Sequence, residues 1–479
     1  MDGLSAILAD RVILILLCNK QFEMAANVAM SESMVFSPRP AAMRAKRMRA
    51  VYVPQSGGQN QAPGSVIRIN IPTAPNNYLL TGNTSLKFTV TTDQVSNLDG
   101  SAGAASYFSK IVIYHGSNQL ESISGLARLT SCLNDCTRTP NEMQSVGSIT
   151  QGQPGADPTP IDGVTVVDKD EDDVVVAQVA EVEELVEELA NIRDAVIDGD
   201  DAGTYTYQIP ILSGVCGTLC PKALPLSAMT AADIRIELTL AQKEDALQSS
   251  EAALEWTASN FELHCDLLQL DPASEAMVVS AAGGQFSVGT QSYSQATSVV
   301  AESANSASVL LPFRYSSLKS ILLGHYQQSI ARNFADKFTS RSRADLQSYF
   351  FRIGSSHVPA NPVELGTATT VPCEAFVQLM SAFHVSVGNI QFGNMMNISS
   401  YNTNQGRTSM GKFLVGLELE SFQKGSSDRV ESGTNTLSSQ VFAELRYGDG
   451  GTPAAQDINS WAYHDVLLTM TGGVCRATI

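Results

Sequence analysis

Apolar and polar residues alternate along many short stretches of this chain. In SVIRINIP (65–72), Ile67, Ile69 and Ile71 alternate with residues such as Arg68. A period of two puts the apolar side chains on one face of a β-strand. The pattern therefore predicts a strand with one buried face.

Two series of such stretches follow one another, each punctuated by Gly, Ser, Asn and Pro turns. The first series predicts strands at 65–72, 85–92, 109–121, 204–212, 233–241 and 260–270. The second predicts strands at 285–294, 306–315, 348–354, 412–422, 440–448 and 463–472. Short helices are expected around 316–331 and at 373–383. Because helices do not alternate regularly with strands, the pattern favours two all-β domains.

The strand series divide the chain of 479 residues into four parts. Residues 1–64 are rich in Ala, Met and Arg and end in a Gly/Gln linker, so we expect a basic, flexible N-terminal arm. The first domain is predicted at 65–270, a linker at 271–284 and the second domain at 285–479. Each domain has the length of an antiparallel sandwich or barrel of about eight strands. One very large β structure is less favoured, because domains usually stop growing near about 250 residues.

Charge is concentrated in two segments of opposite sign. Between Asp168 and Asp201 there are fourteen Asp and Glu against two Lys and Arg, so this segment carries −12 of the total −18 and the rest carries −6. SPRPAAMRAKRMRA (37–50) has no acid, and its cations are Arg39, Arg44, Lys46, Arg47 and Arg49. Charged residues make up only 16% of the chain, against about 25% in ordinary domains. We infer that neighbouring subunits cover much of the surface.

The acidic segment has helical periodicity. Its apolar residues recur at steps of four, three, four, three and seven, which places them on one helix face. This packing stripe consists of Val175, Val179, Val182, Val186, Leu189 and Val196. A lone helix with so many like charges is marginal in water, so the stripe must pack on something. We predict an acidic helical insertion at about 166–201 within the first domain. The alternative is a disordered acidic loop.

Two cysteine pairs have a suggestive spacing. Cys132/Cys136 and Cys216/Cys220 could each supply half of a zinc site. They lack the flanking polar and Gly residues of a zinc knuckle, and Cys216 lies in an apolar run. We therefore expect free, buried thiols, as in a protein made in a reducing compartment.

The sequence offers little catalytic chemistry. HExxH, GxSxG and GxGxxG do not occur. GRTSMGK (406–412) matches GxxxxGK, but Phe413 stands where the phosphate loop needs Ser or Thr for Mg²⁺, and a strand is predicted after it. Glu418 and Glu420 could form an acid pair, although strand alternation often produces such pairs. Neither an enzyme nor a cofactor or metal site is expected.

The apolar run at 8–20 is too short to span a bilayer, and no targeting segment is predicted.

Several segments resemble a known family. QIPILSGVCGTLCPKALPLSAMTAADIRIELTLA (208–241) resembles the first domain of jelly-roll viral capsid proteins in its strand, Gly-containing loop, Leu-Pro-Leu element and RIELTL-type strand. In the second half, 311–323, 349–364 and 421–439 look similar to capsid proteins of DNA viruses with two jelly rolls in tandem. The resemblance is one of pattern and covers residues 65 to 475.

The resemblance implies an all-β fold of two tandem, eight-stranded jelly rolls and a structural role in a virion. Three copies would form a homotrimer that tiles an icosahedral shell, with minor capsid proteins as further partners. The basic arm would face the interior and contact the genome or an anionic internal membrane. The acidic insertion would stand on the outer surface as part of a tower. The receptor stays open, and synthesis would take place in the host cytoplasm or nucleus.

Two other functions remain open at this point. One is a minor capsid, penton or fibre component, which copy number in purified particles would separate from the major component. The other is a jelly-roll carbohydrate-binding or glycan-active protein, which a groove of clustered aromatic and carboxylate residues would favour. Aromatic residues make up 7% of the chain, with two Trp, and the sequence presents no evident stacking platform.

Overall fold

A computed structural model shows how the predicted strands assemble. It describes residues 44–55, 59–93, 97–98, 100–139, 142–152, 203–249, 254–328, 337–366, 372–383, 396–404, 411–421 and 432–479. Arg39, the acidic insertion at 166–201 and its packing stripe lie outside the described residues.

The first half of the chain forms two antiparallel sheets that face one another. One sheet has the order β1 (Ala45–Tyr52), β11 (Trp256–Leu270), β3 (Asn77–Thr92) and β7 (Thr204–Pro210), with β8 (Leu224–Pro225) beside β3. The other has the order β2 (Val66–Ile71), β9 (Ile234–Leu240), β5 (Phe108–His115) and β6 (Asn118–Ser124). Alternate residues of these strands are buried, as the period of two predicts. Together the two sheets form the first sandwich.

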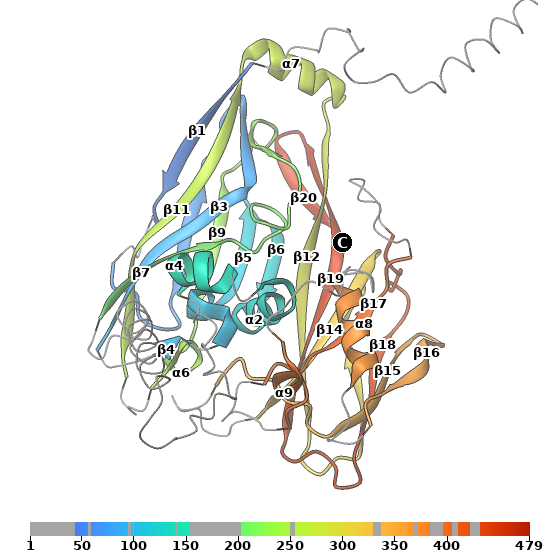
Figure 1. The fold of residues 1–479 in the computed structure, drawn as a ribbon. Coiled ribbons are helices and arrows are strands. Elements are labelled where there is room, and N and C mark those ends of the chain that lie inside the picture. Colours follow the sequence, from blue (N-terminus) through green and yellow to red (C-terminus); the bar gives the residue numbers. More distant parts are fainter. Residues whose placement is uncertain are drawn as a thin grey trace, which may run out of the picture. The chain divides into compact units, whose positions relative to one another are not determined.

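The second half repeats this arrangement. One sheet has the order β12 (Phe286–Val300), β19 (Gln456–Thr471), β14 (Leu318–Gln327) and β17 (Val415–Glu418), with β20 (Val474–Thr478) beside β19. The other has the order β13 (Ser306–Leu311), β18 (Val441–Tyr447), β15 (Leu346–Ile353) and β16 (Ser356–Glu364). These sheets form the second sandwich (Figure 1).

Both sandwiches have the same strand order. If the eight main strands of each are counted along the chain, one sheet reads first, eighth, third, sixth and the other reads second, seventh, fourth, fifth. This is a jelly roll, in which both sheets are built from strands distant in sequence. A small pair, β4 (Asn97–Leu98) with β10 (Leu247–Gln248), completes the described strands.

Short helices lie mainly in the connections between strands. They are η2 (Gly100–Tyr107), α2 (Leu126–Thr137), η3 (Met143–Gly147), α4 (Ser148–Gln151), η4 (Leu226–Ala228), α6 (Lys243–Ala246), α7 (Pro272–Ala281), α8 (Cys373–Ala382) and α9 (Ile398–Tyr401). The predicted helix at 373–383 corresponds to α8. α7 joins the two sandwiches and begins where Asp271 caps the Ser274 amide and Pro272 occupies the first turn. None of the helices in the described ranges is long and apolar enough to cross a bilayer.

The structure corrects the boundary of the N-terminal arm. Ala45–Tyr52, predicted as part of a flexible arm, is strand β1 and pairs with β11 along its whole length. The pattern of apolar residues did not predict this strand, because it contains Lys46, Arg47 and Arg49. An edge strand with one face in solvent can carry charged residues where a buried strand has apolar ones. The first sandwich therefore begins at Ala45, not at residue 65.

The helix predicted around 316–331 is also wrong. Leu318–Gln327 forms β14, which lies between β19 and β17 and is buried almost throughout. A strand covered on both faces shows no alternation, so its sequence, LKSILLGHYQ, cannot be told from a buried helix by periodicity. Tertiary burial decides the difference.

Candidate functional site

The two sandwiches meet along one side of each. β6, at the edge of the first sandwich, lies next to β12 at the edge of the second, and β20 also packs against β6 (Figure 1). α2, which follows β6, also contacts the second sandwich through the side chains of Arg128, Ser131 and Asp135. We call this region the junction. It holds several buried polar groups that bind one sandwich to the other.

Glu121 of β6 is the central group at the edge of the junction. Its carboxylate accepts hydrogen bonds from Ser213 Oγ, from the Gly214 amide at 2.9 Å and from Ser292 Oγ of β12 at 2.5 Å. Complete burial raises the pKa of Glu121, and the hydrogen bonds from Ser213 and Ser292 oppose that rise. The carboxylate thus ties a strand and a loop of the first sandwich to a strand of the second.

Backbone atoms of the two sandwiches come very close beside Glu121. Thr290 Oγ1 donates a hydrogen bond to the Gly214 carbonyl at 2.5 Å. A Cβ atom on Gly214 would lie 2.1 Å from the carbonyl oxygen of Gln291. Only glycine permits this approach, so the sequence SGVCG around Gly214 is adapted to the junction.

A second buried group involves α2. Asp135 of α2 forms an ion pair with Arg341 of the second sandwich, and Lys412 Nζ lies 2.9 Å from the other carboxylate oxygen. Arg341 also donates to Ser131 Oγ at 3.3 Å. All three ionic side chains are at most 14% exposed. Removing one partner from such a group is costly because it leaves a buried charge unbalanced.

Arg128 of α2 forms the third contact across the junction. Its guanidinium lies 4.1 Å from the ring centres of both Tyr326 and Phe338, and its Nε donates to the Phe338 carbonyl at 3.2 Å. A guanidinium between two aromatic faces is stabilised by their quadrupoles. α2 is therefore anchored to the second sandwich by charge as well as by packing.

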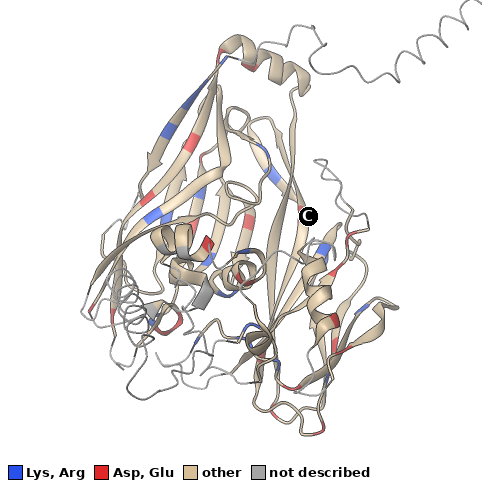
Figure 2. Cartoon of the chain, viewed as in Figure 1, with Lys and Arg blue, Asp and Glu red and all other residues tan. Residues whose placement is uncertain are grey.

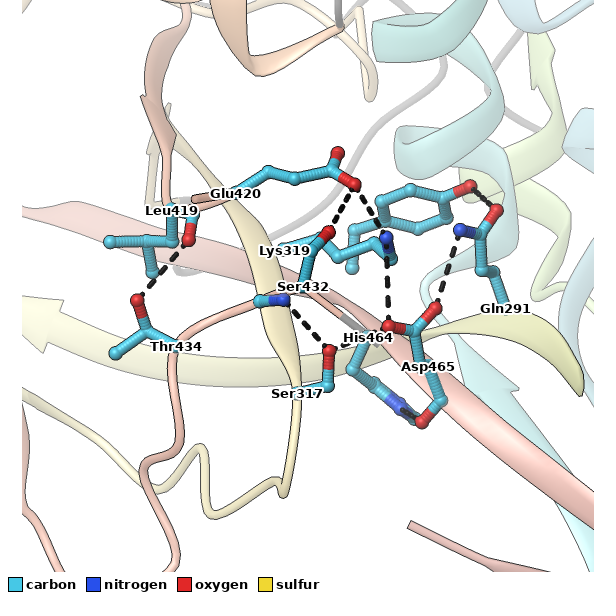
Figure 3. Close-up of polar contacts among 11 residues, drawn as sticks. Gln291, Ser317, Lys319, Leu419, Glu420, Ser432, Thr434, His464 and Asp465 are labelled. Atoms are coloured by element: carbon cyan, nitrogen blue, oxygen red, sulfur yellow. Dashed lines mark hydrogen bonds and ion pairs between the residues drawn. The ribbon is translucent and has the colours of Figure 1, made fainter. Parts of the chain in front are cut away.

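The second sandwich contains a further buried ionic cluster near β12, shown in Figure 3. Lys319 Nζ lies 2.8 Å from Glu420 and 3.5 Å from Asp465. Ser432 Oγ donates to Glu420 at 2.6 Å, and Ser317 Oγ donates to Asp465 at 2.6 Å (Figure 3). These contacts join β14, β19 and the segment after β17. The carboxylates of Glu420 and Asp465 bind the ammonium group of Lys319, and this pairing explains why a charged side chain can be buried here.

Other residues singled out by the sequence are placed as follows. Cys132, Cys136, Cys216 and Cys220 are buried and form no disulfide bond with a described cysteine, and burial raises the pKa of the thiols of Cys136 and Cys216 well above the usual value. Lys412 of the phosphate-loop match binds Asp135, and the strand predicted after it is β17. Burial, and then the charge of Glu420, raises the pKa of Glu418. Among the described residues, no group of three or more His, Cys, Asp and Glu is arranged to hold a metal ion.

The described members of the predicted basic arm lie on or next to β1. Arg47 forms an ion pair with Asp266, and a guanidinium nitrogen of Arg49 lies 2.6 Å from His264 Nδ1, both on the neighbouring β11. Figure 2 shows this arrangement as basic positions along β1 with acidic positions beside them on β11. Lys46 is exposed on β1, and Arg44 immediately precedes the strand. The structure thus makes Lys46, Arg47 and Arg49 part of a sheet edge.

The two oppositely charged segments connect to opposite ends of the first sandwich. Ala45 pairs with Leu270, next to α7. At the other end of β11, Trp256 pairs with Thr92, whose amide donates to the Gly203 carbonyl just after the acidic insertion. A strand of this length spans about 45 Å at about 3.3 Å per residue. The basic segment and the acidic insertion are therefore attached far apart.

Sequence comparisons find no counterpart, whereas structural comparisons do. No protein-family model matches the chain, and no curated protein matches it. The structure is similar to VP54 of PBCV-1, fitted into a cryo-EM reconstruction of the virophage Sputnik, with TM-score 0.57, 10% identity and coverage of 93% of this chain and 99% of that one.

Two further solved structures give the same result. The Faustovirus major capsid protein matches with TM-score 0.57, 9% identity and coverage of 98% of this chain and 99% of that one. The Sputnik virophage structure matches with TM-score 0.56, 10% identity and coverage of 94% and 92%. The matches span both sandwiches, so the predicted fold is confirmed: this chain is a double jelly roll.

Proposed function

We propose that this protein is the major capsid protein of a DNA virus and that three copies form a homotrimer that tiles an icosahedral shell. One observation carries the proposal: the match to major capsid structures extends over at least 93% of this chain and includes both sandwiches in order. A lectin or an enzyme built on one jelly roll would match over one half. The junction supports a structural role because its polar groups are used to hold the two sandwiches together.

The proposal is tested by expressing the chain and measuring its mass by light scattering. We expect a stable trimer, because obligate interfaces bury upwards of about 2,000 Å². Electron microscopy of concentrated protein or of particles should then show capsomers of three subunits at high copy number. A monodisperse monomer at micromolar concentration would contradict the proposal, and a low copy number would favour a penton or fibre component.

The orientation in the shell follows as a second part of the proposal. The end of the first sandwich at α7, where the basic segment joins, would face the interior, and the arm would contact nucleic acid or an anionic membrane. The opposite end, where the acidic insertion is attached, would face outward. The support is the separation of the two attachment points along β11. Carboxylates at the outer end would keep particles apart by like-charge repulsion.

The arm is tested by neutralising the two cations of its basic segment, 37–50, that precede β1. Replacing Arg39 and Arg44 with Gln should weaken genome or membrane association while the trimer stays intact, because β1 begins at Ala45 and keeps its pairing with β11. Binding through phosphate contacts should weaken steeply as the salt concentration rises.

The acidic insertion is tested by replacing Val182 and Leu189 with Asp. Unchanged trimer stability and helix content would show that the predicted stripe packs on nothing.

A further inference from the structure

A cavity lies between the two sheets of the first sandwich. Its volume is about 280 Å³. Leu86 of β3 and Ile209 of β7 line it from one sheet, and Ile111 of β5 and Leu238 of β9 line it from the other. α2 packs on β5, α4 packs on β7, and both helices contribute further lining residues (Figure 1). Protein interiors contain few voids larger than a water molecule, so a cavity of this size is a candidate ligand site.

The cavity opens between the end of α2 and the loop that follows β7. The lining residues that are exposed there are Thr137, Pro210 and Thr218. Among the described residues of the lining, Arg138, directly after α2, is the one that carries a charge. The cavity therefore combines apolar walls with a polar mouth that holds one cation. This combination suits an amphipathic ligand with an anionic head group.

The volume sets the length of such a ligand. An apolar cavity of about 150 Å³ binds benzene, which has six non-hydrogen atoms. By proportion, the cavity in the first sandwich holds about twelve non-hydrogen atoms. Decanoate, with ten carbons and two oxygens, is a fatty acid of this size.

Arg138 can hold a carboxylate at the mouth. Burial lowers the pKa of its guanidinium, and the charge of Glu142 opposes that change, so the group is cationic at neutral pH. A guanidinium has five N–H donors and can bind a carboxylate beside its other partners. The C-terminal carbonyls of a helix repel an anion. At the end of α2 this repulsion is reduced, because the Leu133 carbonyl already accepts a hydrogen bond from Thr137 Oγ1 at 2.7 Å.

We propose that this cavity binds a free medium-chain fatty acid, with the alkyl chain between the two sheets and the carboxylate at Arg138. The site lies within one sandwich and does not involve the trimer. Its failure would therefore leave the proposed capsid function standing.

The position of the cavity gives the ligand a structural consequence. Thr130, Leu133 and Thr137 of α2 line the cavity, whereas Arg128 and Asp135 contact the second sandwich. At 3.6 residues per turn, these two sets lie on opposite sides of the helix. A bound fatty acid would thus fill the space behind the helix that anchors the junction. Decanoate should therefore raise the unfolding temperature of the protein.

Calorimetric titration of the full chain with fatty acids of increasing length tests the proposal. We expect one decanoate to bind per chain. Affinity should rise about fourfold per methylene group from hexanoate to decanoate and should not rise further for tetradecanoate, because the cavity is then full. Affinity that keeps rising with length, or several molecules bound per chain, would show adsorption to apolar surface and overturn the proposal. Absence of saturable binding would overturn it as well.

A variant that fills the cavity tests the location of the chain. Thr130→Phe places a ring in the cavity and should weaken decanoate binding at least about tenfold, since the ring takes the space of several methylene groups. Thr206→Phe is the matched control, because Thr206 is exposed on β7 and is not among the lining residues. It should change the affinity by less than about twofold. Equal effects of the two variants would contradict the assignment to this cavity.

A second variant tests the head group and leaves the walls unchanged. Arg138→Gln should weaken decanoate binding at least about tenfold, as expected for the loss of a charged hydrogen bond. Binding of decanol, which has no charge, should change by less than about twofold. Arg68→Gln is the control, since Arg68 is 60% exposed and does not line the cavity. If Arg138→Gln weakens decanoate and decanol alike, or weakens neither, Arg138 does not hold the carboxylate and the proposal is wrong.

Discussion

The two sandwiches share a strand order and differ in what they bury. Between its sheets the first packs aromatic rings: Phe88 lies edge-on to Phe108 at 5.1 Å and stacked on Phe261 at 5.9 Å. The second also packs aromatic rings, such as Tyr349 edge-on to Phe351, and in addition encloses Lys319 and His325, each at most 2% exposed. A jelly roll thus specifies where strands go and leaves the chemistry of the interior open.

The difference has consequences for stability. Apolar packing is insensitive to pH, whereas buried charges and neutral histidines depend on it. Each sandwich contains one of the chain's two tryptophans, Trp256 in β11 and Trp461 in β19. Variants that keep a single tryptophan would therefore report the unfolding of each sandwich separately by fluorescence.

The largest effect should come from the aromatic core of the first sandwich. Phe88→Ala removes a completely buried ring and should lower the free energy of unfolding by about 4 kcal/mol. Urea denaturation followed through Trp256 should show this loss equally at pH 5 and pH 7.5. If Trp461 reports the same loss, the junction couples the sandwiches into one cooperative unit and the comparison breaks down.

A somewhat smaller effect is expected at the junction. Asp135→Asn leaves Arg341 and Lys412 without their carboxylate and should cost about 3 kcal/mol, because a buried cation loses its counter-charge. Both tryptophans should report the loss, since Asp135 belongs to the first sandwich and Arg341 to the second. Glu237→Gln is the control, as its partner Arg68 is 60% exposed and such pairs contribute less than about 1 kcal/mol. An equal loss of unfolding free energy in Asp135→Asn and Glu237→Gln would show that the buried pair stabilises the protein no more than the exposed one.

The pH dependence should give the smallest effect and should appear in the second sandwich. Burial lowers the pKa of His325 from 6.5 to about 3. As the pH falls below 6.5, the unfolded chain binds a proton at His325 that the folded chain does not bind until about pH 3. Stability is thus complete above pH 6.5 and decreases below it, by about 2 kcal/mol at pH 5.

Fluorescence of Trp461 at different urea concentrations and pH values would measure this decrease. His325→Gln should reduce the slope between pH 6.5 and pH 5, because glutamine does not titrate. His464, whose pKa burial lowers to about 4, should add a similar slope. An unchanged slope in the His325→Gln variant would show that His325 does not contribute.

The sequence pattern predicted strands correctly where one face of the strand is exposed to solvent. The alternation in 65–72 and 233–241 predicted β2 and β9, because each of these strands has one buried and one less buried face. It failed for β14, whose two faces are both covered, and for β1, whose edge position allows charged residues. In both cases the missing information is the identity of the neighbouring strands.

The junction could not have been predicted from sequence. Glu121 and Ser292 are 171 residues apart, lie in different sandwiches and belong to no recognisable motif. The sequence SGVCG around Gly214 gave only a weak indication, since a glycine in an apolar run often marks a site where another part of the backbone comes close. What it approaches, the carbonyl of Gln291, is visible only in the folded chain.

The sequence by itself determined that this protein is all-β, that it has two domains and that its charge is divided between a basic and an acidic segment, because these properties follow from local pattern and composition. The tertiary structure decided which strands pair, that β1 belongs to the first sandwich and that Glu121, Asp135 and Arg128 hold the two sandwiches together. Such contacts join residues far apart in sequence, and their energies depend on burial, which no local pattern records.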